Sequence, residues 1–235
     1  MTDRNAFIKS VDIAEKIIEN GGEISRAEET VKRINNAFGQ DCRVFALPTL
    51  IIAQCGDFTQ IRRIIPHDAD LAELTRLNSL SRSICKSFSK EISESDGNYP
   101  DIIEKISVFG ATGAFSIFFG GTLLDALFSG IIGLIITYPP YKKMSLPLFS
   151  SNLLDSFIAG VLACLPAVFG IDTHRDKIII GTIMLLVPGL TVVNAIRDMM
   201  SSDLFAGLIE LVIAIMSALG IALGTAGALM IFKGL

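Results

Sequence analysis

The stretch from Val187 to Glu210 reads VPGLTVVNAIRDMMSSDLFAGLIE, and it places a Pro-Gly break and ionisable residues beside strongly apolar segments. An interrupted helix in a bilayer needs cover from protein or from a wet cavity, because hydrocarbon leaves backbone groups unpaired. Arg197 and Asp198 follow the break, and Glu210 lies inside the next apolar segment. Ionisable groups at that depth are costly and commonly serve a path for ions or substrate. The stretch therefore indicates a transporter.

Composition divides the chain near residue 100. The first 100 residues hold 13 of the 20 Lys+Arg and 15 of the 24 Asp+Glu, although they are less than half of the 235 residues. The mean hydropathy of +0.56 thus averages two unlike parts. We expect residues 1–99 to form a cytoplasmic α+β domain and residues 100–235 to form a five-helix transmembrane domain.

Apolar blocks in the second part reach or exceed the ~20 residues that a spanning helix needs. They are Ile106 to Tyr138, Leu153 to Ile171, Ile178 to Ile196 and Leu204 to Phe232. The first block is too long for one span, and Gly120 and Gly121, followed by Asp125, divide it. The predicted fold is an α-helical membrane protein of about five transmembrane helices with an N-terminal cytoplasmic α+β domain.

The N-terminus is charged and amphipathic and lacks the apolar core of a signal peptide, so we expect the first domain to stay in the cytoplasm. Lys142 and Lys143 follow the second span and would then be cytoplasmic, in agreement with the positive-inside rule. His174, Arg175 and Lys177 would face outward, which weakens the argument, although acidic residues accompany them. The predicted location is the cell (inner) membrane.

Within the first domain, Val11 to Ile18 show helical spacing, and Asn20-Gly21-Gly22 end that helix. Ser25 and Glu28 predict a capping box at the start of a second helix. Three β-type runs follow, at 43–47, 49–54 and 58–65, and a long helix is expected over 70–91. Residues 94–100 would link this domain to the membrane.

Several function classes find no support. The four cysteines show no metal-ligand or disulfide spacing, and a net charge of -4 does not favour nucleic-acid binding. A membrane-anchored hydrolase or a sensor remains the alternative to a carrier. The sequence holds two histidines and no G-x-S-x-G motif, so we predict no enzyme, no cofactor, no metal and no catalytic residue.

The order and spacing of a series of residues resemble the threonine/serine exporter family over most of the chain. In the first domain they are Gly22, Glu23, Arg26, Glu28, Glu29 and Thr30, then Pro48 and Thr49, Arg62 and Arg63, and Leu77, Asn78, Leu80, Ser81 and Arg82. In the second they are Gly120, Gly121 and Asp125, then Pro188, Gly189, Asn194, Arg197, Asp198, Gly207 and Glu210. Gly22 departs from the Ala that is usual in the family.

The resemblance implies a secondary transporter subunit that exports small carboxylate metabolites. Threonine and serine are the substrates of fused members, and succinate is that of split ones. Because the sequence ends after one membrane unit, the resemblance also implies a second five-helix membrane subunit as partner, with a homo-oligomer as another arrangement. No Walker A motif is present, so ATP drive through this chain is not expected.

A carrier of carboxylates needs a cation or free helix N–H groups. The break at Pro188 and Gly189 could start a half-helix that supplies N–H groups, or it could be a kink that only shapes packing. Arg197 could bind a carboxylate, or it could anchor the membrane interface or pair with Asp198. Glu210 could carry a coupling proton, or it could bond a neighbouring helix. The predicted substrate and coupling residues are Pro188, Gly189, Asn194, Arg197, Asp198, Glu210 and, more weakly, Asp125.

A second group of charged residues lies in the cytoplasmic domain. It comprises Glu23, Arg26, Glu29, Arg62, Arg63 and Arg82. The group could gate the path or bind a ligand, and it could equally be an ion-pair network that holds the helices to the sheet. The Gly220, Gly224, Gly227 and Ala228 series is expected to be a packing face.

Overall fold

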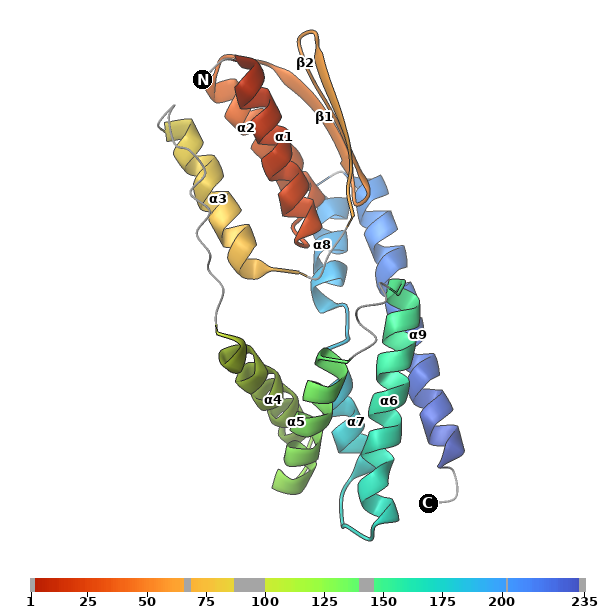
Figure 1. Cartoon of the computed structure of the whole chain (residues 1–235). Coiled ribbons are helices and arrows are strands. Elements are labelled where there is room, and N and C mark those ends of the chain that lie inside the picture. Colours follow the sequence, from red (N-terminus) through yellow and green to blue (C-terminus); the bar gives the residue numbers. More distant parts are fainter. Residues whose placement is uncertain (1–2, 66–68, 87–99, 140–145, 202, 233–235) are drawn as a thin grey trace. The chain divides into compact units, whose positions relative to one another are not determined.

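The computed structural model describes residues 3–65, 69–86, 100–139, 146–201 and 203–232. This part of the chain is mostly helical, with one small antiparallel sheet (Figure 1). In chain order the elements are α1 (Asp3–Glu19), α2 (Ile24–Ala37), β1 (Cys42–Leu47), β2 (Leu50–Cys55), β3 (Phe58–Arg63), α3 (Leu71–Lys86), α4 (Asp101–Phe118), α5 (Leu123–Thr137), α6 (Leu148–Val168), α7 (Arg175–Ile183), α8 (Gly189–Met200) and α9 (Leu204–Ile231).

The chain forms two compact units. Unit 1 contains residues 1–97 and 189–213, and unit 2 contains residues 98–188 and 214–235. Helix α8 and the first part of α9 therefore belong to the same unit as the N-terminal elements, although they lie far from these elements in the sequence. The predicted division at residues 99 and 100 stays a prediction.

The sheet of unit 1 has the order β1-β2-β3, with helices against one face. Alternation along β2 buries Ile51 and Ala53 and exposes Ile52, as the period of a strand requires. Helices α1 and α2 lie side by side and contact the sheet (Figure 1). Their core includes Phe7, Ile17 and Ile34. The three predicted strands are confirmed to within two residues at each end.

Two sequence expectations for this unit are wrong. Cys42 and Cys55 form a disulfide, because antiparallel pairing of β1 with β2 sets them directly opposite each other. Their spacing alone gave no sign of this pairing. The predicted capping box is absent: α2 begins at Ile24, Ser25 lies inside it, and the N-cap residue is Glu23, whose side chain makes no capping bond.

The remaining expectations for unit 1 concern element ends. Helix α1 ends where predicted, because Gly21 adopts a φ of 75° and Gly22 N–H bonds the Ile17 carbonyl. Helix α3 is described to Lys86. Residues 87–91 of the predicted helix and residues 94–99 of the predicted linker lie outside the described residues, as do His67 and residues 141–143.

Unit 2 contains α4 to α7 and the later part of α9. The predicted interruption of the first apolar block is confirmed, since α4 ends at Phe118, Gly120 has a φ of 89° and α5 begins at Leu123. The block at 178–196 is likewise divided, into α7 and α8, with α8 starting at Gly189 directly after the proline. Proline lacks an N–H and disfavours helix at the preceding residue, which explains why Val187 is not helical and why α8 starts after Pro188, whereas α7 already ends at Ile183.

Two helices in the described part are long and apolar enough to cross a membrane, α6 and α9, and α5 is a shorter apolar helix. Small residues let α6 and α9 approach closely. A Cβ added to Gly224 would lie 2.1 Å from Ser156 Oγ, and one added to Gly160 would lie 2.6 Å from the Ala228 Cβ. This close approach supports the packing interpretation of the glycine series.

Candidate functional site

The candidate site is a polar cluster in unit 1, formed where α8 meets the corner between α1 and α2. Asn194 and Asp198 lie one helical turn apart on α8, so their side chains share a face of that helix. Both are buried, at 6% and 0% exposure. Buried polar groups of this kind need partners, and the corner supplies them.

Asn194 donates from Nδ2 to the Gly21 carbonyl oxygen at 2.9 Å. This carbonyl is free to accept because the left-handed conformation of Gly21 turns the chain out of α1. Gly22 then allows the close turn, since a Cβ there would lie 2.7 Å from the Ile17 carbonyl oxygen. The two glycines thus place the start of α2 beside α8.

Asp198 provides the cap for α2 that Ser25 was expected to provide. Its Oδ2 accepts the Ile24 N–H and its Oδ1 accepts the Ser25 N–H, both at 3.1 Å. These N–H groups are among the first of the helix, where no carbonyl can reach them and where the helix dipole favours negative charge. Glu28, the other half of the predicted box, accepts the Ala46 N–H and pairs with Lys32 at 3.3 Å.

Arg197 and Glu23 form an ion pair at the edge of the cluster. The Arg197 side chain is 56% exposed and that of Glu23 is 14% exposed, so the guanidinium is open to solvent while the carboxylate is largely covered. Arg197 therefore pairs with a residue of the corner, and Asp198 uses both of its oxygens on backbone N–H groups.

Glu210 adds a third carboxylate. Gly207, one turn earlier on α9, permits close approach to α8, since a Cβ there would lie 2.5 Å from the Ala195 carbonyl oxygen. This packing brings Glu210 near enough to Asp198 and Glu23 to interact with both electrostatically. Glu210 is 8% exposed, and its Oε2 has no hydrogen-bond partner in the described part of the chain.

The predicted cytoplasmic group is only partly brought together. Arg62 lies on the sheet face that α1 covers and pairs with Asp12 at 3.3 Å and, from Nε, with Glu15 at 4.0 Å. Burial raises the pKa of Glu15, and Arg62 acts in the opposite direction. Glu23 joins the polar cluster instead. Within the residues that the structure describes, no ion pair is found for Arg26, Glu29, Arg63 and Arg82.

Asp125 belongs to unit 2 and is fully buried. It forms a capping box with Thr122, accepting from that residue's N–H at 2.7 Å. It also accepts the His174 N–H at 2.8 Å and contacts His174 Nδ1 at 3.0 Å. Asp155 is also buried, inside α6. The contacts of Asp125 connect the starts of α5 and α7.

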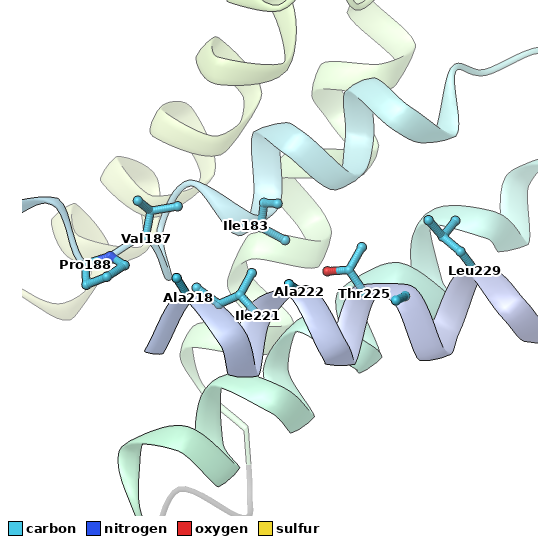
Figure 2. Close-up of a pocket in the computed structure, with 9 residues that line it drawn as sticks. Ile183, Val187, Pro188, Ala218, Ile221, Ala222, Thr225 and Leu229 are labelled. Carbon is cyan, nitrogen blue, oxygen red and sulfur yellow. The ribbon is translucent and has the colours of Figure 1, made fainter. Parts of the chain in front are cut away.

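Pro188 lines an apolar groove between α7 and α9 in unit 2. Figure 2 shows Ile183, Val187 and Pro188 facing Ala218, Ile221 and Ala222 across it. The groove encloses about 420 Å³. Its walls are aliphatic apart from the Thr225 hydroxyl, so it offers no charge to a carboxylate. No group of three or more His, Cys, Asp or Glu in the described residues could hold a metal ion.

Comparison with known proteins identifies the family. The family model ThrE, described as "Putative threonine/serine exporter", matches residues 10–232. The chain belongs to this family. No curated protein and no solved structure matches it. The family and the apolar helices together make this exporter homologue a membrane protein, as the sequence indicated.

Sequence reasoning selected the residues of the cluster but not their partners. Asn194, Arg197, Asp198 and Glu210 were found because polar residues are rare in apolar segments. Gly21 and Gly22 were interpreted as a helix stop, with Gly22 also in the family series, and Glu23 was placed in a different group. The hydrogen-bond partners of Asn194 and Asp198 lie more than 170 residues earlier in the sequence, and no spacing pattern predicts contacts over such a separation.

Proposed function

We propose that this exporter-family protein is one subunit of a secondary transporter that moves small carboxylate metabolites out of the cell. Threonine-like and serine-like amino acids are the first candidates, and dicarboxylates such as succinate are the second. The observation that carries the proposal is the polar cluster. It contains the partly exposed guanidinium of Arg197, on a helix that starts at the Pro-Gly break, and the buried carboxylate of Glu210, whose Oε2 has no hydrogen-bond partner among the described residues.

In this proposal Arg197 binds the carboxylate of the substrate, and Glu210 carries the coupling charge. Asn194 and Asp198 hold α8 against the α1–α2 corner, so that Arg197 has a fixed position. The experiment is an efflux assay in cells preloaded with labelled threonine, serine and succinate. Arg197→Gln should abolish efflux at normal membrane levels, and Glu73→Gln should not change it, because Glu73 pairs with Arg76 on α3. Unchanged efflux in Arg197→Gln would contradict the proposal and favour the hydrolase or sensor alternative.

We further propose that α4, α5 and the α7 and α8 segments join α6 and α9 as membrane helices, in a five-helix arrangement within the inner membrane. A second five-helix subunit would complete the path. Large apolar side chains exposed along α4, α5 and α9, such as Phe118, Leu123 and Phe205, support contact with lipid or with another subunit. Coexpression with the partner should raise efflux, and full transport by this chain alone in liposomes would contradict the two-subunit proposal.

The proposed orientation places the N-terminus in the cytoplasm. The Cys42–Cys55 disulfide favours the opposite side, because disulfides are rare in the cytoplasm. Cys85 provides the test, since it is a partly exposed free thiol of unit 1, whereas Cys164 is buried. In a Cys164→Ala background a membrane-impermeant maleimide should label Cys85 only after cells are permeabilised. Labelling of Cys85 in intact cells would show that unit 1 lies outside the cytoplasm and would contradict the proposed orientation.

A further inference from the structure

The apolar groove of unit 2 continues beyond the residues that Figure 2 shows, which run from Pro188 at one end to Leu229 at the other. A second cavity of about 500 Å³ shares Ile183, Thr225 and Leu229 with the first, so the two form one continuous space. In the second cavity the lining changes, because Arg175 at the start of α7 belongs to it. The combined space, here called the α7–α9 groove, is therefore aliphatic over most of its length and charged at one end.

The charged end of the groove carries an excess of positive charge. Asp176 also lines it, but this exposed carboxylate pairs with Lys177 at 3.1 Å, so a neighbouring cation already balances it. Arg175 adds a further positive charge to the same cavity. Asp172 and His174 are close in sequence but do not line the groove. A molecule that occupies the whole groove therefore needs an anionic group at one end and a hydrocarbon chain along the rest.

The length of the groove matches one leaflet of a bilayer. Helix α9, which is long and apolar enough to cross a membrane, lines the groove from Ala218 to Leu229. These eleven steps along a helix correspond to about 16 Å, at ~1.5 Å per residue. Half of a hydrocarbon core that is ~30 Å thick measures about 15 Å. If Arg175 lies at the level of the headgroups, the opposite end at Pro188 therefore reaches the centre of the bilayer.

We propose that the α7–α9 groove binds an acyl chain of an anionic phospholipid whose headgroup phosphate contacts Arg175. A guanidinium suits a phosphate group, and the aliphatic walls suit the acyl chain. Val187 and Leu229 are both exposed, so the groove is open to the lipid that surrounds a membrane protein. A helix of a second subunit could fill the aliphatic part, but it has no need of a cation at one end. The site lies in unit 2, and the proposal does not depend on what the protein exports.

The test of the headgroup contact is native mass spectrometry of the purified full chain. The protein is released from detergent that contains equal amounts of dioleoyl phosphatidylglycerol, which is anionic, and dioleoyl phosphatidylcholine, which has the same acyl chains and no net charge. The wild-type protein should retain at least fivefold more of the anionic lipid. Arg175→Gln should bring the two lipids to within twofold of each other, and Arg175→Lys should keep the preference. Arg43→Gln removes an exposed cation of unit 1 and is the control that should change nothing.

The acyl chain has its own test in the same assay. Ala222 is exposed and lines the groove, so Ala222→Phe places a large side chain where the acyl chain would lie. This variant should retain at least fivefold less of both lipids. Leu223→Phe is the matched control, because Leu223 is the next residue of α9, is exposed and does not line the groove. Thermal unfolding without added lipid confirms that each variant is folded.

Four outcomes would overturn the proposal. Equal retention of the two lipids by the wild-type protein would show that the groove does not select an anionic headgroup. Unchanged retention in Ala222→Phe would show that the lipids bind elsewhere on the apolar surface. If that variant keeps its lipids but no longer assembles with a second membrane subunit, the groove belongs to a partner helix. Equal loss of both lipids in Arg175→Gln, together with lower stability in the absence of lipid, would assign Arg175 a structural role only.

Discussion

Asp198 shows how one side chain can connect distant parts of the sequence. Its carboxylate is fully buried, and it accepts the first two N–H groups of a helix that lies more than 170 residues earlier. The sequence also predicts a local capping box at Ser25 and Glu28, but in the structure neither side chain caps α2. A buried carboxylate oxygen is a stronger hydrogen-bond acceptor than a hydroxyl, which explains why Asp198 caps α2.

Replacing Asp198 should therefore destabilise unit 1. Asp198→Ala leaves two N–H groups of α2 unsatisfied in a buried position, and we expect a loss of about 2 kcal/mol or more in the free energy of unfolding. The measurement is thermal or denaturant unfolding of the purified protein in detergent. Asp41→Ala removes an exposed carboxylate in the same unit and should change stability by less than about 0.5 kcal/mol. Equal stability of the two variants would show that Asp198 does not cap α2.

At this scale the sequence identified which residues are unusual but not what they contact. The sequence alone shows a polar residue in an apolar segment, and so Arg197 and Glu210 could be selected without the structure. The contact of Arg197 with Glu23 depends on two glycines, a helix break and the packing of Gly207. Each of these features can be recognised locally in the sequence, but no sequence pattern predicts how they combine to bring Arg197 to Glu23.

Element boundaries were more accessible to sequence reasoning. Gly21 and Gly120 both adopt a positive φ at helix ends, and Pro188 precedes α8, so the predicted breaks follow from backbone sterics. The Cys42–Cys55 pair was missed because it depends on the antiparallel register of β1 with β2, which brings together two cysteines that are 13 residues apart in the sequence. Periodicity thus locates elements, whereas pairing between elements requires the fold.

The interface of α6 with α9 offers a matched pair of substitutions. Gly224→Ala would place a Cβ 2.1 Å from Ser156 Oγ and 2.3 Å from the Leu153 carbonyl oxygen, and we expect it to destabilise unit 2 by about 1–3 kcal/mol. Gly227→Ala meets its nearest neighbour at 3.6 Å, an ordinary contact, and should be neutral or slightly stabilising. Unfolding in detergent measures both. Similar effects at the two positions would contradict close packing at Gly224.

The start of α5 depends on Asp125 in a comparable way. Its carboxylate bonds Thr122 and His174 at once, so Asp125→Ala should loosen both α5 and α7 and cost about 2 kcal/mol or more of unfolding free energy. Asp176→Ala is the control, because Asp176 is exposed and pairs with the neighbouring Lys177. Limited proteolysis of the two variants in membranes would report the difference. Loss of transport by Asp125→Ala at unchanged stability would instead favour a direct role in the path.

The two units of the molecule share one helix. The first part of α9 belongs to unit 1 and carries Glu210, and the rest belongs to unit 2 and packs with α6. A change at Glu210 therefore occurs on an element that is part of both units. Such continuity is what a carrier needs when binding of a charge is to alter a path elsewhere. This position on a shared helix is a reason to assign the coupling charge of the proposed transporter to Glu210.

Coupling through Glu210 leads to a prediction for transport by the whole molecule. Glu210→Gln keeps the size and most of the hydrogen bonding of the side chain but removes its negative charge and its titration. If protons drive export by binding to this carboxylate, flux in the variant should no longer depend on an imposed pH gradient. Export from proteoliposomes at several gradients, with the partner subunit present, measures this dependence. Glu73→Gln changes an equally local ion pair in unit 1 and should retain the full gradient dependence. Gradient dependence that persists in a well-folded Glu210→Gln protein would exclude the coupling role of Glu210. Attention would then turn to Asp198, a buried carboxylate that interacts electrostatically with Glu210.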